Sequence, residues 1–218
     1  NLNISPVLMG NVTIWKPATT AILSNYYLMK IFKEAGLPDG VINFLPGSGS
    51  VISKVAFASP HLAGIHFTGS TSTFKAFWKE IGKNIDSYRT YPKIVGETGG
   101  KDFIFAHKSA DPRALAVASV RGAFEFQGQK CSAASRAYIP KSLWDETLAH
   151  VKDMMKTVKV GDVFDFTNFV NAVIDEKSFD NIAGYIDRAK KSRKAKIVLG
   201  GKYDKSVGYF IDPTIIVT

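Results

Sequence analysis

The chain has 218 residues, of which 45% are hydrophobic and 22% charged, a composition that excludes disordered and low-complexity classes. A single cysteine excludes a disulfide within the chain, and one cysteine with four scattered histidines argues against a zinc site, so we expect no metal. The net charge of +9 is spread along the sequence, and no stretch approaches the roughly 20 continuous apolar residues of a membrane helix. We therefore expect neither a membrane nor a nucleic-acid partner.

Short apolar runs alternate with amphipathic segments along the first half of the chain. Their spacing predicts strands at 12–15, 41–44, 64–67 and 94–95, and helices at about 20–35, 51–58 and 71–85. Thr19 or Thr20 is expected to cap the first of these helices. Alternation of this kind is typical of βαβ units, so the fold class is α/β with a parallel sheet.

The second half continues the alternation after the glycine pair Gly99-Gly100, which permits a close approach of the backbone. Here the pattern predicts strands at 102–105, 137–139, 197–199 and 209–217, and helices at about 111–125, 142–158 and 178–190. Asp111 or Ser109 is expected to cap the first of these helices. We place a domain boundary at the glycine pair, which divides the chain into residues 1–97 and 98–218.

Cys131 follows a predicted helix and a break at Gly128, and it precedes a strand. Lys130 is its neighbour, and a nearby cation lowers the pKa of a thiol and so favours the nucleophilic thiolate. The alternative is an inert cysteine that is buried as a small hydrophobe. These residues alone leave both interpretations open.

Glu97 ends an apolar strand beside glycines, where burial can raise the pKa of a carboxyl group enough for general base catalysis. The alternative is a strand-end carboxylate that only accepts backbone hydrogen bonds. Lys16 ends another strand, at the carboxyl edge where ligands of α/β sheets usually bind, although a surface lysine without a role is the default interpretation of its position.

Two glycine-containing turns are candidate phosphate sites. Residues 67–71 (Phe-Thr-Gly-Ser-Thr) join a strand to a helix, whose free N–H groups can bind phosphate, although a simple helix cap by Ser70 or Thr71 explains the same residues. Residues 46–49 (Pro-Gly-Ser-Gly) are better interpreted as a turn. The basic run at 190–196 could bind nucleic acid, but a solvated helix end is the preferred interpretation.

Five motifs, in order and at the expected spacing, resemble the aldehyde dehydrogenase superfamily over essentially the whole chain. They are Trp15-Lys16-Pro17, Phe67-Thr68-Gly69-Ser70, Glu97-Thr98-Gly99-Gly100-Lys101, Gly128-Gln129-Lys130-Cys131-Ser132-Ala133 and Gly208-Tyr209-Phe210-Ile211-Asp212-Pro213-Thr214. Phe74, where many members carry a glycine, together with Trp78, is similar to the 1-pyrroline-5-carboxylate dehydrogenase branch.

The resemblance implies a Rossmann-like parallel sheet of the NAD-binding domain in residues 1–97, followed by the start of the α/β catalytic domain in residues 98–218. Cys131 would be the nucleophile, Glu97 the base that activates water, and Ser132 a substrate-binding residue. The implied NAD-binding residues are Lys16, Gly69, Ser70, Thr71, Ser72 and Thr73.

The implied reaction is the NAD-dependent oxidation of the aldehyde L-glutamate γ-semialdehyde to L-glutamate in proline degradation. Alternatives are another aldehyde substrate or a non-catalytic protein that keeps the fold. The resemblance also implies a homo-oligomer, in the mitochondrial matrix of a eukaryote or the cytoplasm of a bacterium. Because members of the superfamily are more than twice as long, we expect a central fragment that is inactive by itself.

Overall fold

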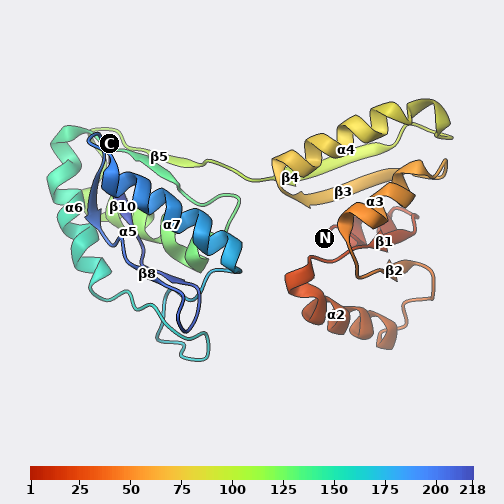
Figure 1. Ribbon diagram of the computed structural model, residues 1–218, viewed down its shortest axis with the longest axis horizontal. Coiled ribbons are helices and arrows are strands. Elements are labelled where there is room, and N and C mark those ends of the chain that lie inside the picture. The colour runs from red at the N-terminus through yellow and green to blue at the C-terminus, as the bar shows by residue number, and fades with distance from the viewer. The chain divides into compact units, whose positions relative to one another are not determined.

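The computed structural model describes all 218 residues and divides them into two compact units, residues 1–98 and 99–218 (Figure 1). The division lies beside the glycine pair at which the sequence suggested a boundary. Helices pack against short strand pairs in each unit, and three of the five pairs are parallel. The predicted α/β class is therefore confirmed.

The first unit consists of helices and parallel strands. Its elements are α1 (Ile4–Leu8), β1 (Thr13–Trp15), the 3₁₀ turn η1 (Thr19–Ala21), α2 (Ile22–Glu34), β2 (Ile42–Phe44), α3 (Gly49–Ala58), β3 (Gly64–Gly69), α4 (Thr71–Lys83), the 3₁₀ turn η2 (Ile85–Ser87) and β4 (Lys93–Thr98). Strand β1 pairs with β2 and strand β3 with β4, so the hydrogen bonds join the strands in pairs rather than in one continuous sheet.

An aromatic cluster holds the β3–β4 pair to its helices. The ring of Phe77 on α4 lies 4.9 Å from that of Phe67 on β3 and 4.9 Å from that of Phe57 on α3, both in edge-to-face geometry. Phe57 and Ile81 are buried in this part of the unit, and Met29 and Ile42 are buried beside α2 and β2. These aromatic contacts pack α3 and α4 against β3, the strand whose end carries several candidate residues.

The predicted cap by Thr19 or Thr20 is wrong. Both residues lie inside η1, and α2 begins only at Ile22 without a side-chain cap. A 3₁₀ turn is common at a helix start, and here the N–H of Ala21 closes it with a 3.0 Å bond to the carbonyl of Ala18. Helix α1 was not predicted, since five residues are too few to show a helical period.

The second unit contains one parallel and two antiparallel strand pairs. Its elements are β5 (Phe103–Phe105), α5 (Pro112–Phe124), the 3₁₀ turn η3 (Glu125–Gly128), β6 (Arg136–Tyr138), α6 (Lys141–Met155), α7 (Glu176–Lys191), β7 (Lys196–Leu199), β8 (Tyr203–Asp204), β9 (Phe210–Ile211) and β10 (Ile215–Val217). Strand β5 pairs with β6, β7 with β10, and β8 with β9.

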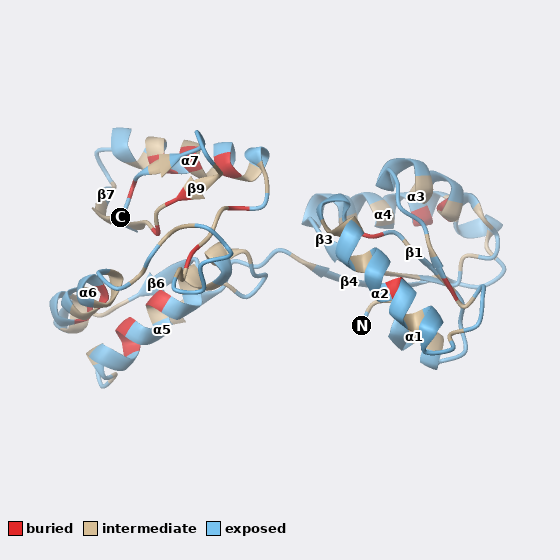
Figure 2. Ribbon diagram, turned by 90° about the horizontal axis from the view of Figure 1, so that it is seen from below, coloured by how far each residue is buried: buried red, intermediate tan, exposed pale blue.

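Two apolar cores support this unit, and the buried stretches are visible along α5 and α7 (Figure 2). Ala116 and Val120 of α5 pack with Val151 of α6, whereas the core of α7 is formed by Val173, Phe179, Ala183, Ile186 and Ile211. Asp111 caps α5 by accepting a 2.7 Å bond from the N–H of Ala114, which confirms one of the two predicted caps.

The single strand predicted at 209–217 is wrong, because Asp212 and Pro213 separate β9 from β10. Proline has no N–H to donate to a strand ladder. The basic run begins with Lys190 and Lys191 in the last turn of α7, where Arg188 also lies, as expected for a helix end. No helix is both long and apolar enough to cross a membrane.

Candidate active site

Cys131 and Ser132 occupy the two central positions of a tight turn in the second unit. The N–H of Ala133 closes this turn by donating a 3.1 Å hydrogen bond to the carbonyl of Lys130. Both central residues are exposed, and Cys131 is a free thiol. The turn therefore presents the sulfur and the Ser132 hydroxyl at the surface of this unit, and the thiol is not buried as the alternative interpretation supposed.

The sequence suggested that the ammonium group of Lys130 acts on the neighbouring thiol. In the structure this ammonium group is engaged elsewhere. It forms a 2.8 Å ion pair with Glu125, whose other carboxylate oxygen lies 2.7 Å from Arg121. The Lys130 hydrogen bond and charge, aided by Arg121, lower the pKa of Glu125 below its ordinary value. Lys130 thus joins the cysteine turn to the end of α5, and its charge is shared with Glu125.

The backbone before the cysteine has an uncommon conformation. Phe126 and Gln127 have positive φ angles of 52° and 56°, and Gly128 follows at 67°. Two adjacent left-handed residues with side chains cost on the order of 1–3 kcal/mol each unless surrounding contacts hold them. These three residues reverse the chain between α5 and the turn that carries Cys131.

Glycine gives the cysteine turn a close backbone neighbour within the same unit. A Cβ placed on Gly100 would overlap the carbonyl oxygen of Cys131 and the carboxylate of Asp102, whereas one on Gly99 would meet nothing. The Asp102 carbonyl also accepts bonds from the N–H of Ser135, at 3.0 Å, and from its hydroxyl, at 3.3 Å. Segment 100–102 therefore supports the cysteine turn. The close backbone approach predicted for the glycine pair is made by Gly100 and not by Gly99.

Glu97 lies in β4 of the first unit, directly opposite Thr68 of β3 in the parallel register. The carboxyl ends of the two strands thus bring Glu97 alongside the loop that starts α4. Glu97 is exposed, and no hydrogen bond or ion pair engages its side chain. The burial that the sequence suggested for Glu97 is therefore absent from this unit. The carboxylate is open to a water molecule or a substrate, and it does not accept the backbone hydrogen bonds of the alternative interpretation.

The segment after β3 forms a capped helix start. Ser70 accepts a 3.1 Å bond from the N–H of Thr73, and its hydroxyl lies 2.8 Å from that of Thr73 and 3.0 Å from that of Ser72. The N–H groups of Thr71 and Ser72 have no intrahelical acceptor, because they lie in the first turn. The cap and the anion site proposed for this segment are therefore compatible, since they use different N–H groups.

Phe74 of α4 packs against the β3–β4 pair, where it contacts Phe67 of β3 and Gly96 of β4. Its ring stacks parallel to that of Phe67 at 5.9 Å, and a Cβ on Gly96 would overlap it. Trp78 contacts the same ring edge-on at 6.4 Å. Glycine at 96 is thus required by the aromatic residue at 74, a relationship that the separate motifs do not reveal.

Lys16 follows β1 and lies beside the start of α3. A Cβ on Gly49 would be in ordinary contact with the Lys16 side chain, and the ammonium donates a 2.7 Å bond to the carbonyl of Pro17. Lys16 is exposed. The segment predicted as a turn at 46–49 ends at Gly49, which is the first residue of α3. The Lys16 side chain therefore lies beside the start of α3.

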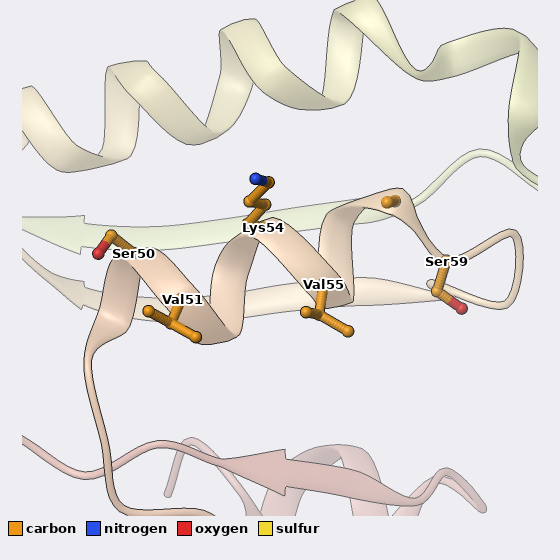
Figure 3. A pocket seen from close by; sticks show the side chains of 6 residues that line it. Ser50, Val51, Lys54, Val55 and Ser59 are labelled. Carbon is orange, nitrogen blue, oxygen red and sulfur yellow. The ribbon is translucent and has the colours of Figure 1, made fainter.

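A hollow on the surface of α3 contains none of the predicted site residues (Figure 3). Its lining residues are Ser50, Val51, Lys54, Val55, Ala58 and Ser59. Lys54 points away from Val51 and Val55, which are both largely exposed (Figure 3). No group of three or more potential metal-ligating side chains exists in the structure.

Sequence reasoning missed two glutamines next to the cysteine. Gln127 and Gln129 are half-buried, and both bind the backbone of the segment before α7. Their partners lie 45 positions away in sequence, so no local pattern could have indicated the contacts.

Comparisons with known proteins agree with this architecture. The model of the family described as "Aldehyde dehydrogenase family" matches residues 2–218. Relatives named "Delta-1-pyrroline-5-carboxylate dehydrogenase, mitochondrial" from Dictyostelium discoideum and Danio rerio are 53% and 49% identical, over 99% and 100% of this chain. The alignments cover 39% of each relative, so the chain spans about two fifths of their length.

Solved structures give the same result. Crystal structures of the Delta-pyrroline-5-carboxylate dehydrogenase from Mycobacterium tuberculosis, one of them bound with NAD, match with a TM-score of 0.95 and 48% identity. These matches cover 99% of this chain and 40% of the solved one. A 1-pyrroline-5-carboxylate dehydrogenase from Thermus with bound NAD matches with a TM-score of 0.91 and 33% identity.

Proposed function

Since this chain belongs to the aldehyde dehydrogenase family, we propose that the complete protein oxidises L-glutamate γ-semialdehyde to L-glutamate with NAD. The semialdehyde is in equilibrium with 1-pyrroline-5-carboxylate, the compound after which the relatives are named. The observation that carries the proposal is the exposed Cys131 at the centre of a turn that Gly100 supports from behind.

Cys131 supplies the nucleophile. Its thiolate adds to the aldehyde carbon, a carbon–sulfur bond forms, and the carbonyl oxygen becomes an oxyanion that needs hydrogen-bond donors. The N–H of Cys131 donates to no group of the chain and is one such donor. Bound NAD would supply the hydride acceptor for this carbon, and Cys131 would then hold the acyl group as a thioester.

Glu97 completes the reaction as the base. It removes a proton from water, the hydroxide adds to the thioester carbon, and the Cys131 thiolate leaves as the carboxylic acid forms. The Glu97 carboxylate has no bonded partner and is open to a water molecule. Ser132, the other central residue of the turn, would hydrogen-bond the substrate.

The first unit has the groups that would hold NAD. The capped start of α4 offers the free N–H groups of Thr71 and Ser72 to a pyrophosphate, next to Gly69, with the hydroxyls of Ser70 and Thr73 nearby. The exposed ammonium of Lys16 would bond the adenosine ribose. Residues 1–98 would therefore belong to the NAD-binding domain and residues 99–218 to the catalytic domain.

The names of the relatives support the semialdehyde over another aldehyde, and the presence of both Cys131 and Glu97 argues against a non-catalytic protein. Self-association of the complete enzyme rests on the family resemblance and is testable by analytical ultracentrifugation. The mitochondrial names of the eukaryotic relatives support a matrix location in a eukaryote, and the alternative is the cytoplasm of a bacterium.

An aldehyde panel tests the proposal on the complete protein. NADH formation with glutamate semialdehyde should exceed that with acetaldehyde or other short aldehydes, and Cys131→Ala should abolish turnover while NAD still binds. Comparable turnover by Cys131→Ala, or no preference for the semialdehyde, would overturn the assignment. The 218-residue chain alone serves as a further sample and should form little NADH.

A further inference from the structure

We propose that Gln127 and Gln129 are positioning residues that dock the Cys131 turn on the backbone of residues 172–174. The inference rests on the proposed function, because Cys131 is there the nucleophile. Gln127 donates a 3.2 Å hydrogen bond from Nε2 to the carbonyl of Ala172. Gln129 accepts a 3.0 Å hydrogen bond at Oε1 from the N–H of Ile174.

The two amide groups have opposite roles. A backbone carbonyl can only accept, so Gln127 must present its NH₂ group, and a backbone N–H can only donate, so Gln129 must present its oxygen. We call residues 171–174 the strap. Two alternate residues of the strap, Ala172 and Ile174, thus meet two alternate residues of the loop, Gln127 and Gln129.

Hydrogen bonds and burial hold the strap in place. Its Val173 is buried in the core of α7, at 6% exposure, and donates a 2.9 Å bond to the carbonyl of Tyr209. Asn171 donates a 3.1 Å bond to the carbonyl of Gly161, and Asp175 caps α7 by accepting from the N–H of Ser178 at 2.7 Å. The strap is therefore held at both ends and in the middle.

The conformation of the cysteine loop requires such a support. Phe126 and Gln127 are both left-handed, a state that persists in non-glycine residues only where neighbouring contacts determine it. Gln127 and Gln129 flank Gly128 and lie four and two residues before Cys131. Their bonds to the strap fix the stretch of backbone that aims the sulfur, and a displacement of about 1 Å can cost on the order of a hundredfold in rate.

The test measures the hydrogen bond and the chemistry separately, on the complete enzyme. Gln129→Met keeps the length of the side chain but offers only a weak acceptor, whereas Gln129→Glu keeps an oxygen for the N–H of Ile174. Hydrogen exchange of the Ile174 amide reports the bond, and the Val173 amide, bonded to Tyr209, is the internal reference. Steady-state kinetics with glutamate semialdehyde report kcat and the KM for NAD.

We expect Gln129→Met to speed exchange at Ile174 about tenfold or more, leave Val173 unchanged, and lower kcat at least about tenfold with little change in KM for NAD. Gln129→Glu loses only the long 3.5 Å bond from Nε2 to the carbonyl of Phe126, so it should keep the protection and most of kcat. Gln127→Glu adds the same charge near Cys131 but loses its donor, so its kcat should fall well below that of Gln129→Glu. Gln127→Met tests the same loss without a charge if Gln127→Glu does not fold.

Three results would overturn the proposal: unchanged protection of Ile174 in Gln129→Met, normal kcat despite lost protection, or equal kcat in the two glutamate variants. If the wild-type enzyme oxidises no aldehyde, the proposed function fails by itself. The rate of Cys131 alkylation by iodoacetamide, followed on its peptide by mass spectrometry, then replaces kcat. Unequal alkylation of Gln127→Glu and Gln129→Glu would support docking, and equal alkylation would overturn it.

Discussion

Gly100 lies against the backbone carbonyl of Cys131 so closely that no side chain fits at this position. The contact joins the segment that begins the second unit to the turn that presents the thiol. Both partners in the contact are backbone, so neither can rotate away as a flexible side chain would. The position of Cys131 is therefore linked to the absence of a Cβ thirty-one residues earlier in the chain.

Gly100→Ala should displace the cysteine turn. Overpacking a rigid site typically costs about 1–3 kcal/mol, and we expect a loss of this size together with a large fall in kcat. The measurements are urea unfolding and steady-state kinetics of the complete enzyme. Gly99→Ala is the matched control, because its new methyl group would meet no neighbour, and it should behave like the wild type. Equal effects of the two substitutions would contradict the account.

Ser70→Ala should weaken both α4 and cofactor binding. The hydroxyl of Ser70 serves the N–H of Thr73, and loss of such a cap costs about 0.5–2 kcal/mol. Unfolding in urea measures the stability, and titration calorimetry measures the Kd for NAD. Ser72→Ala leaves the cap in place, so its free energy of unfolding should stay near that of the wild type. A Ser70→Ala variant of unchanged stability would show that the cap is not formed.

Gly96→Ala should be costly only while Phe74 is present. The added methyl group would overlap the Phe74 ring, which is stacked on Phe67 and has little freedom to move. We expect a loss of about 1–3 kcal/mol in the wild-type background. In a Phe74→Ala background the same substitution should be nearly neutral, so a double-mutant cycle measures the coupling. Additive losses would mean that the ring does not occupy this space.

The ion pair between Glu125 and Lys130 should make the cysteine loop sensitive to acid. Lys130 and Arg121 lower the pKa of Glu125, so its stabilising effect is present above the unfolded pKa of about 4.3 and disappears as pH falls through the lower folded value. Glu125→Gln should therefore be less stable than the wild type at neutral pH and equal to it in strong acid. Thermal melts across this range provide the measurement.

The matched control is Lys130→Met, which removes the cation that pairs with Glu125. In this background the Glu125→Gln difference at neutral pH should be smaller than in the wild type. Added salt should also reduce the Glu125 difference, because the pair is exposed. A Glu125→Gln difference that persists in strong acid would assign it to packing instead of charge.

Local patterns in the sequence were enough for most elements of the fold. Alternating apolar residues and glycine breaks located the strands and helices from β1 to β7, because burial of one face imposes a period that a single segment displays. The failures arose where the period is too short or is interrupted. Helix α1 has only five residues, and Pro213 splits the strand predicted near the end of the chain.

Some residues of the candidate site could be predicted from local sequence and others could not. Cys131, Glu97 and Ser70 could be named as candidates because each stands in a local motif at the end of an element. Lys130 was assigned an effect on the thiol that its ion pair with Glu125 does not support, since adjacency in sequence says nothing about a competing carboxylate. The supports by Gly100 and Gln129 depend on contacts between distant segments, which only the folded chain brings together.

The most direct test of the account is a search for the acyl group on Cys131 in the Glu97→Gln variant of the complete enzyme. Cys131 would still attack and the hydride would still leave, but water would lack its base. Mixing this variant with NAD and glutamate semialdehyde should give one equivalent of NADH per active site and an acyl adduct on the Cys131 peptide by mass spectrometry. Normal steady-state turnover without such an adduct would contradict the role of Glu97 as the base.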